Sequence, residues 1–531
     1  MDKGKEVCLE ELRGDFMKVI TAVLIDTVSI QRYIFSSNRL KENLGASHLV
    51  KHIYDEQMKI TIRDMFGKKA EKEFSDWKKC PEKVKIIDEN AKFEVEYIGG
   101  GNALLLFRED KAKEFIKNWT KSLLIETPGL QTAVAISDDF NLDNFKHGLE
   151  RLFKQLTQNK NKFFPDTTLS KYGITADCSL SGLSGDIYYQ DIDMDRYISS
   201  VSYAKLKAAK SAQYEIQSKY ADILKDKYGF TTQIDQLGQM KGEKSYIAVV
   251  HIDGNQMGKR FISCEDLPSL RKLSISVQEA TDNSFKELIR YIVINMPFFI
   301  DKNNSFEIVK EDGKYILPIR PIIIGGDDIT FVCDGRLGVH FAEKFIEFFS
   351  KQSVSDKEPL SACAGVSITK TKYPFYRGYL LAEELCTEAK KCAKKEKDSS
   401  WLDFHIAYGG FSGTLLEIRE KHYKVKEGEL HFGPYRLSNN KPDDEKNIIN
   451  LKKGIKYLTK WPRSKLKEMR SVLTLSWEAT KKFIEEMKAR GLKLPNIEGG
   501  TDYTINGWEN AKTPYFDMIE LMEMYPEYFL R

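Results

Sequence analysis

The chain has 531 residues, a net charge of +4, 41% hydrophobic residues and 30% charged residues. This composition is typical of a folded globular protein and excludes a disordered or fibrous one. No apolar run reaches the roughly 18 residues that span a bilayer. The N-terminus is charged and lacks the apolar core of a signal peptide, and the eight cysteines contain no C-x-x-C pair. We therefore expect a cytoplasmic protein with reduced thiols. Because the net charge is small, any basic binding surface must be local, and residues 205–210 and 390–397 are the candidates.

An internal repeat organises most of the chain. Each copy begins with an apolar strand that ends at an aspartate, and continues through a helix to a β-hairpin with a glycine-rich turn. The spacing from aspartate to turn is 75 residues from Asp26 to Gly101 and 74 residues from Asp253 to Asp327. A further strand and an amphipathic helix follow each hairpin. The expected strands are residues 19–25, 93–98, 103–107 and 131–136 in the first copy and 246–252, 319–324, 329–333 and 362–368 in the second, with final helices at 145–158 and 376–395.

This order of elements is that of a split βαβ, ferredoxin-like unit. We predict an α+β protein with two ferredoxin-like palm domains of the nucleotidyl cyclase type. The expected domains are a first palm (1–163), an irregular inter-palm region (164–243), a second palm (244–410) and a C-terminal helical domain (411–531). In the last domain, helices are expected at 447–459, 464–491 and 508–524. Its aromatic residues either fill the domain's own core or dock other subunits, and they include Trp461, Trp477, Trp508 and Phe516.

Three acidic residues distinguish the second palm. Asp253 ends a buried strand, and Asp327 and Asp328 lie in the turn of the neighbouring hairpin. Their carboxylates are expected to converge, because the two central strands of this sheet are adjacent. Carboxylate oxygens suit Mg²⁺ or Mn²⁺, and two such ions can activate an attacking hydroxyl and stabilise a leaving pyrophosphate. We predict that these three aspartates are catalytic and that they bind metal together with Ile252; the alternative is an ordinary hairpin turn.

The residues around the acids suit a nucleotide such as ATP. Glycines allow a base or ribose to approach the backbone, a helix N-terminus favours phosphate, and two lysines on one helical face can reach a phosphate or simply be solvated. The first palm keeps the glycines but lacks the acid pair, so it either binds a second substrate or is a structural copy. The predicted nucleotide-binding residues are Gly254, Asn255, Gly325, Gly326, Lys390 and Lys394 in the second palm and Gly99, Gly100, Gly101 and Asn102 in the first.

Several of these segments carry a resemblance to a known family. In chain order they are residues 30–35 leading into 44–47, residues 98–102, residues 253–258, residues 325–328 and residues 432–437. Together they resemble the large polymerase/cyclase subunit of type III CRISPR effector complexes, Cmr-type branch, over nearly the whole chain. The resemblance implies RNA-activated synthesis of cyclic oligoadenylate from ATP, with Asp253, Asp327 and Asp328 as metal-binding acids. It also implies other Cmr-type subunits, guide RNA and target RNA as partners, and no membrane.

The sequence departs from this family in two respects. Only about 16 residues precede the first palm strand and no His is followed by Asp, so we expect no HD nuclease domain. The segment Cys178-Ser179-Leu180-Ser181-Gly182 has Ser where a second Cys would stand, so we expect a degenerate zinc-finger remnant and no zinc. Three other functions stay open: adenylyl transfer to an acceptor such as S-adenosylmethionine, a non-catalytic RNA-binding scaffold, and a diguanylate cyclase.

Overall fold

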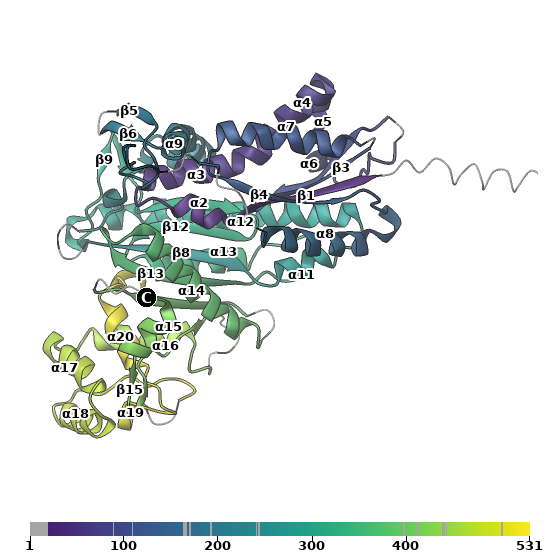
Figure 1. Ribbon diagram of the computed structural model, residues 1–531. Helices are drawn as coiled ribbons and strands as arrows, with labels where there is room; N and C mark the ends of the chain where they lie inside the picture. Colours follow the sequence, from purple (N-terminus) through teal and green to yellow (C-terminus); the bar gives the residue numbers. More distant parts are fainter. Residues whose placement is uncertain are drawn as a thin grey trace, which may run out of the picture.

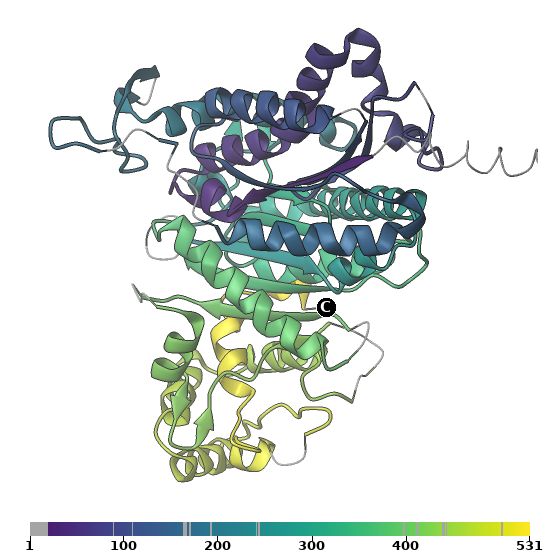
Figure 2. The same ribbon diagram turned by 45° about the vertical axis from the view of Figure 1, so that its right-hand side comes forward.

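The computed structural model describes residues 20–530 except 89, 109, 163–166, 169–170, 192–193, 241, 243–244, 397–398, 410–412, 438–440, 442 and 501–502. The chain forms three tiers, with the first palm at the top of Figure 1, the second palm in the middle and the C-terminal helices at the bottom (Figures 1 and 2). Val19, the first residue of the first expected strand, and Lys397, at the end of a proposed basic stretch, lie outside the described residues.

The first palm contains a four-stranded antiparallel sheet in the order β2-β3-β1-β4, which is the order of a ferredoxin-like unit. Apolar and β-branched residues fill the central strand β1, whose positions 22–25 are fully buried. The elements are β1 (Thr21–Val28), α2 (Ile30–Phe35), α3 (Leu40–His52), α4 (Met58–Phe66), α5 (Lys68–Glu73), α6 (Asp76–Lys79), β2 (Phe93–Gly99), β3 (Asn102–Phe107), α7 (Lys111–Glu126), β4 (Gln131–Ser137) and α8 (Phe145–Lys160).

The second palm repeats this plan in a six-stranded sheet of order β11-β12-β8-β13-β14-β17. Only the β13–β14 pair is parallel among these strands. The elements are β8 (Tyr246–Gly254), α11 (Met257–Ile262), α12 (Leu267–Ile300), β11 (Ile319–Gly325), β12 (Asp328–Asp334), α13 (Gly338–Phe349), β13 (Ala362–Lys370), α14 (Phe375–Ala393), β14 (Trp401–Ile406) and β17 (Tyr435–Arg436). The two palms and the helical C-terminus confirm the fold class predicted from the sequence.

One helix in each palm was missing from the sequence prediction. The helix α7 connects the first hairpin to β4, and α13 connects the second hairpin to β13. Each buries an apolar stripe at helical spacing, such as Phe115, Trp119 and Leu123 on α7. These crossovers complete the second half of each split βαβ unit, so the repeat is more complete than the sequence suggested.

The inter-palm region is not irregular, and the sequence prediction was wrong here. It contains α9 (Ser200–Lys219), a helix of 20 residues that packs closely against α3. A Cβ placed on Gly45 of α3 would lie 1.8 Å from the Lys205 carbonyl oxygen, so this approach requires a glycine. The region also holds β5 (Ile187–Asp191), β6 (Met194–Ile198), α10 (Ala221–Leu224) and β7 (Tyr228–Gly229), the last paired with β10 (Lys314–Ile316), which also pairs with β9 (Lys310–Glu311).

Lys205 and Cys178, two residues of this region considered in the sequence analysis, are both buried. Lys205 is 2% exposed and its ammonium donates to the Tyr33 carbonyl oxygen at 2.5 Å. Residues 205–210 are therefore not a continuous basic surface, although Lys207 and Lys210 are exposed. Cys178, at the proposed zinc-finger remnant, is buried in a small apolar cluster with Met194, Ile198 and Leu206.

The C-terminal helices pack against the second palm. The Phe529 ring stacks on His340 of α13 with 4.2 Å between ring centroids. The helix expected at 464–491 is two helices, because Ser476 caps a new helix at Trp477, and the last helix begins only after Pro514. The elements are α15 (Leu415–His422), β15 (Lys424–Val425), β16 (Gly428–Glu429), α16 (Ile448–Leu458), α17 (Arg463–Leu473), α18 (Trp477–Ala489), α19 (Tyr503–Asn506) and α20 (Tyr515–Met522).

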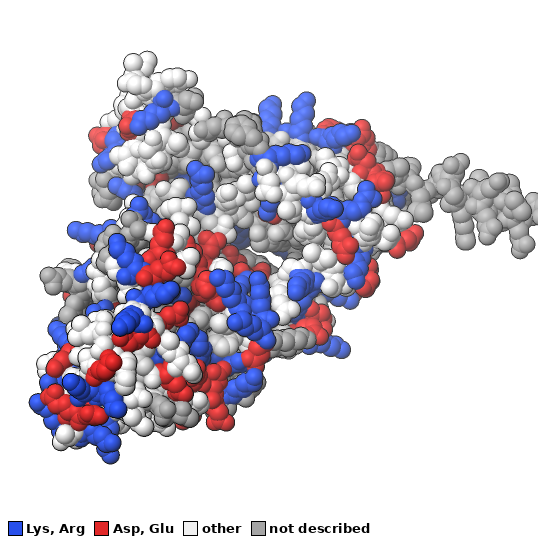
Figure 3. Space-filling view, turned by 60° about the horizontal axis from the view of Figure 1, so that its bottom comes forward, with Lys and Arg blue, Asp and Glu red and all other residues white. Residues whose placement is uncertain are grey.

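The surface of this tier mixes charged side chains with exposed apolar ones, among them Leu416, Leu475 and Ile505. Trp461, Trp508 and Phe516 are at most 8% exposed and fill the local core, whereas Trp477 is 44% exposed. Acidic and basic residues are interspersed over the face seen in Figure 3. No helix in the described part of the chain is both long and apolar enough to cross a bilayer. Among the four aromatic residues considered for docking, only Trp477 keeps an exposed ring.

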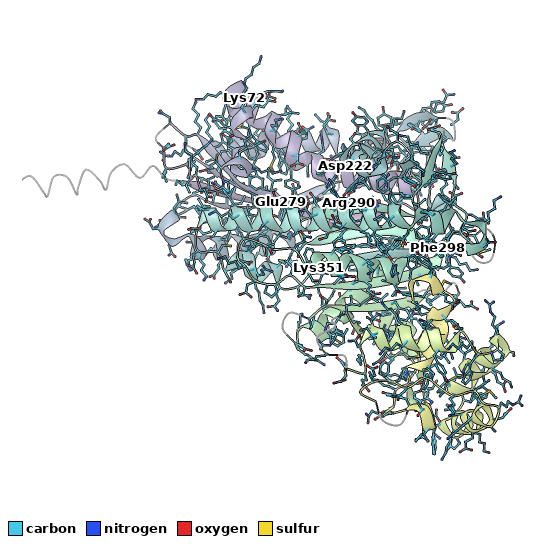
Figure 4. All side chains as sticks on the ribbon, turned by 180° about the vertical axis from the view of Figure 1, so that it is seen from behind. Lys72, Asp222, Glu279, Arg290, Phe298 and Lys351 are labelled. Atoms are coloured by element: carbon cyan, nitrogen blue, oxygen red, sulfur yellow. The ribbon has the colours of Figure 1, made fainter. Side chains whose placement is uncertain are left out.

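The helix α12 lies between the two palms. Its 34 residues extend about 50 Å, and Glu279, Arg290 and Phe298 mark its course in the view from behind (Figure 4). Arg271, on its first turns, is fully buried and pairs with Glu94 and Glu96 of β2 in the first palm, at 2.8 Å each. This helix of the second palm therefore carries a buried charge contact to the first.

Candidate active site

Strand pairing places the predicted acids at one edge of the second palm. In the antiparallel β8–β12 pair, Asp328 lies directly opposite Asp253. The backbone N–H of Gly254 donates to the Asp327 carbonyl oxygen at 3.1 Å. A Cβ on Gly254 would lie 2.8 Å from the Asp327 Cβ, so only glycine allows Asp327 to pack over the end of β8. Gly254 thus has a steric role that permits the acids to gather.

The environment of these acids disfavours their ionised forms. Burial, and next the neighbouring Asp253, raise the pKa of Asp327 to about 7 and raise the pKa of Asp328 well above its usual range. The Asp253 carboxylate lies 2.5 Å from the Lys390 ammonium. Burial alone would lower the pKa of Lys390, but this contact with Asp253 raises it. One lysine therefore partly balances three clustered carboxyl groups.

The three carboxylates are ligands of the kind that a divalent cation prefers, although their oxygens do not converge on a single metal position. Among the described residues, no group of three or more His, Cys, Asp or Glu side chains is arranged to hold a metal ion. In this structure the Asp253 carboxylate pairs with Lys390. The Asp328 Oδ1 atom is nevertheless buried without a hydrogen-bond partner, and carboxylate oxygens are the ligands that Mg²⁺ prefers. Asp253, Asp327 and Asp328 are the residues that fit such an ion. Ile252 is fully buried and apolar, so it has only a backbone carbonyl to contribute.

The turn that carries Asp327 is braced by α12. The Gly326 N–H donates to Gln278 Oε1 at 2.8 Å, and the Thr281 hydroxyl donates to the Gly326 carbonyl oxygen at 2.6 Å. Sequence reasoning missed both residues, because nothing local marks which residues of a long helix face a distant turn. These bonds fix the position of the turn relative to α12.

Other predicted residues are divided between the site and its surroundings. The Asn255 amide donates to the Ser361 hydroxyl and to the Ser399 carbonyl oxygen, each at 3.0 Å, so its NH₂ group braces the loop after β8. Lys394 is exposed at the end of α14, one turn beyond Lys390. A cavity of about 730 Å³ begins at Asn255 and runs between α11, the start of α12 and residues 355–361. The lining of this cavity includes Asn255 but none of the three aspartates, so its space for a ligand of nucleotide size lies next to the loop after β8.

The two glycine-rich turns face each other. A Cβ on Gly326 would lie 3.8 Å from the Gly100 Cα, and one on Gly325 would lie 4.0 Å from the same atom. Gly101 has φ +79°, and a Cβ there would lie 2.3 Å from Ile30 Cδ1. Gly100 of the first palm therefore lies against Gly325 and Gly326 of the second, and Gly101 has a conformational role in its own turn.

The repeat extends to an ion pair that the sequence did not reveal. In the first palm, Asp26 lies opposite Asn102 in the β1–β3 register, as Asp253 lies opposite Asp328. Lys160 at the end of α8 pairs with Asp26, as Lys390 on α14 pairs with Asp253. The first palm therefore keeps one aspartate and its lysine but has Asn in place of the second acid.

Fold and site together define a double-palm protein with a carboxylate cluster in only one palm. Several solved structures are similar to it at 14% sequence identity. The Csm1–Csm4 cassette in complex with AMPPNP has a TM-score of 0.49 and covers 96% of this chain and 70% of that one. The same cassette with cA3 has a TM-score of 0.47 with 97% and 71% covered, and Csm1 of T. onnurineus has 0.48 with 96% and 70% covered.

Sequence comparison identifies one domain of the chain. None of the curated proteins matches it. Residues 246–400 match the family model "Cas10/Cmr2, second palm domain". The match extends from β8 to the residue before β14, so it includes the three aspartates, the glycine turn and Lys390. The part of the chain that matches is thus the part that holds the candidate site.

Proposed function

We propose that this chain is a Mg²⁺- or Mn²⁺-dependent nucleotidyltransferase that makes cyclic oligoadenylate from ATP within a type III CRISPR effector complex. The observation that carries the proposal is the carboxylate cluster of Asp253, Asp327 and Asp328, set opposite the glycine turn of a second palm. The match of residues 246–400 to the Cas10/Cmr2 second palm supports it. The other effector subunits, guide RNA and target RNA are the partners that the sequence resemblance implies.

In this proposal the two palms have unequal roles. The second palm holds the donor nucleotide near its acids, and the first holds the nucleotide whose hydroxyl attacks, near residues 99–102. Placing both reactants in one frame removes much of the entropic cost of their meeting, up to roughly 7–11 kcal/mol. The first palm keeps the Asp26–Lys160 pair but has Asn102 opposite Asp26, which supports binding without chemistry there.

The residues of the second palm can bind, orient and balance charge. Asp253, Asp327 and Asp328 would hold the cation, which when bound supplies positive charge that stabilises the leaving pyrophosphate. Lys390 supplies a fixed positive charge at the end of β8. Gly325 and Gly326 lie against Gly100 of the first palm, and Gln278 keeps that turn in place.

The test is to incubate the protein with labelled ATP and Mg²⁺, alone and in the effector complex with target RNA, and to identify the products by mass spectrometry. We expect adenylate rings from the wild-type complex and none from Asp327→Ala/Asp328→Ala. That variant should melt no lower than wild type, because it removes clustered like charges. The matched control is Asp138→Ala/Asp139→Ala, an exposed adjacent acid pair after β4, which should retain activity.

Each outcome decides between functions. Wild-type rates in the Asp327/Asp328 variant would refute the catalytic assignment. An adenylylated small acceptor in place of rings would favour transfer to a molecule such as S-adenosylmethionine. Failure of the wild-type complex to convert ATP under any of these conditions, with assembly intact, would indicate a scaffold subunit.

A further inference from the structure

Two buried polar atoms next to the candidate site have no hydrogen-bond partner. One is the acceptor Asp328 Oδ1, and the other is the hydroxyl of Tyr379 on α14. The Tyr379 side chain is completely buried. An unsatisfied buried polar group costs about 1–3 kcal/mol, so each such group in a folded protein requires a physical explanation.

The Tyr379 and Asp328 side chains both lie next to one histidine, His251. The ring of Tyr379 packs edge-on against the ring of His251, with 5.6 Å between centroids and 74° between planes. His251 Nδ1 lies 3.4 Å from Asp328 Oδ1 but 3.1 Å from the Thr330 hydroxyl, and the latter is its hydrogen bond.

The electrostatic surroundings keep the Tyr379 hydroxyl protonated. Burial raises the pKa of this phenol far above its usual range, and the next largest causes are the charges of Asp328 and Glu383. Cys386 and Asp253 act in the same direction. The Tyr379 phenol has a proton to donate, and Asp328 Oδ1 is an acceptor without a partner.

The first palm holds the Tyr379 ring in place. Phe35 of α2 stacks on it with 4.0 Å between centroids and 23° between planes, and Phe35 also packs at 5.8 Å against Phe375, one turn before Tyr379 on α14. The tyrosine ring is thus fixed between Phe35 of one palm and His251 of the other. Asp328, whose side chain is 30% exposed, has more freedom to turn than the phenol.

We propose that Tyr379 is a positioning residue, whose hydroxyl donates a hydrogen bond to the Asp328 carboxylate and orients it to bind a divalent cation. The inference rests on the proposed function, because it assigns Asp328 to a metal site. It pairs the two unsatisfied atoms with each other. It also means that Tyr379 connects the two palms, because its ring packs on Phe35 of the first palm and its hydroxyl binds Asp328 of the second.

The test uses Mn²⁺ as the probe and the full chain. Tyr379→Phe removes only the hydroxyl, and the dissociation constant for Mn²⁺ is measured by electron paramagnetic resonance with and without a non-hydrolysable ATP analogue. Loss of a partner that orients a metal ligand typically weakens metal affinity 10–100-fold, so we expect at least a tenfold increase in the dissociation constant. Tyr220→Phe is the matched control, because its hydroxyl is also buried and unpartnered but belongs to the inter-palm region.

The outcomes separate the inference from the proposed function. An unchanged Mn²⁺ affinity in Tyr379→Phe, with wild type binding Mn²⁺, overturns the inference alone. An equal loss in Tyr220→Phe also overturns it, because the effect would then be general. Absence of Mn²⁺ binding by wild type overturns the proposed function and the inference with it. In an Asp328→Asn background, the tyrosine substitution should have no further effect.

Discussion

The buried contact between α12 and the first palm allows a quantitative prediction. Arg271→Met would remove the guanidinium that pairs with Glu94 and Glu96 and that donates to the Lys83 carbonyl oxygen at 2.7 Å. Methionine has a similar length and is apolar, so the change removes charge and hydrogen bonds with little loss of volume. Two buried carboxyl groups would then face each other without a cation.

The expected loss of stability follows from the completeness of this burial. Arg271 and Glu96 are fully buried and Glu94 is 6% exposed. Breaking such a pair by removing one partner typically costs about 3–5 kcal/mol. For a cooperative unit of the size of one palm and its neighbours, this corresponds to a melting temperature lower by roughly 6–20 °C.

The assay is differential scanning calorimetry of wild type, Arg271→Met and Arg271→Met/Glu94→Gln/Glu96→Gln. The triple variant replaces both unpaired carboxyl groups by neutral amides, so it should recover at least half of the lost melting temperature. If Arg271→Met melts within about 2 °C of wild type, the pair does not stabilise the contact between the palms. If the triple variant is no better than the single one, packing and not charge is the cause.

Three further predictions follow from single side chains. Burial raises the pKa of Glu96 to about 8 from 4.5. Between these pH values the folded state keeps a proton that the unfolded state loses, so the free energy of unfolding should fall by about 1.4 kcal/mol per pH unit. Glu96→Gln should flatten the dependence of melting temperature on pH, and an unchanged slope would refute this. Gly99→Trp places an indole toward α12 without backbone strain and should reduce ATP turnover at least tenfold. The control Gly173→Trp, in an exposed loop, should retain turnover. Full activity of Gly99→Trp would show that the first palm is structural only. Trp477→Ala should weaken assembly with partner subunits in a pull-down, and normal assembly would show that α18 is not a docking surface.

The sequence predicted the elements that carry their own local signal. The strands of both hairpins and β4 and β13 were placed within two or three residues, because apolar runs between glycine-rich turns are visible without tertiary information. Asp253 and Asp328 were brought to one edge correctly, because the order of elements in a split βαβ unit determines which strands are neighbours. The helices α7 and α13 were missed because the repeat was recognised from its strands and turns, and the segment between each hairpin and the next strand was not assigned.

The parts that sequence reasoning missed depend on contacts between distant segments. α9 has a weak amphipathic pattern, since it buries small residues and Lys205 against α3 in place of a continuous apolar stripe. Nothing near Lys160 in the sequence indicates that its ammonium meets Asp26. The pairing of Asp253 with Lys390 was also not foreseen, although both residues were singled out, because a lysine considered for phosphate can equally pair with a carboxylate.

The packing of Phe529 on His340 has a consequence for synthesis of the chain. These residues are 189 positions apart, and translation at about 5–20 residues per second separates them by roughly 10–40 s. The strands of the first palm all precede residue 138, so this palm can form while the second is still emerging. During that interval the outer face of α13 lacks its aromatic cover and is open to chaperones or to misassociation. Slow codons in the last third of the gene should therefore lower the yield of soluble protein more than the same codons placed before β8.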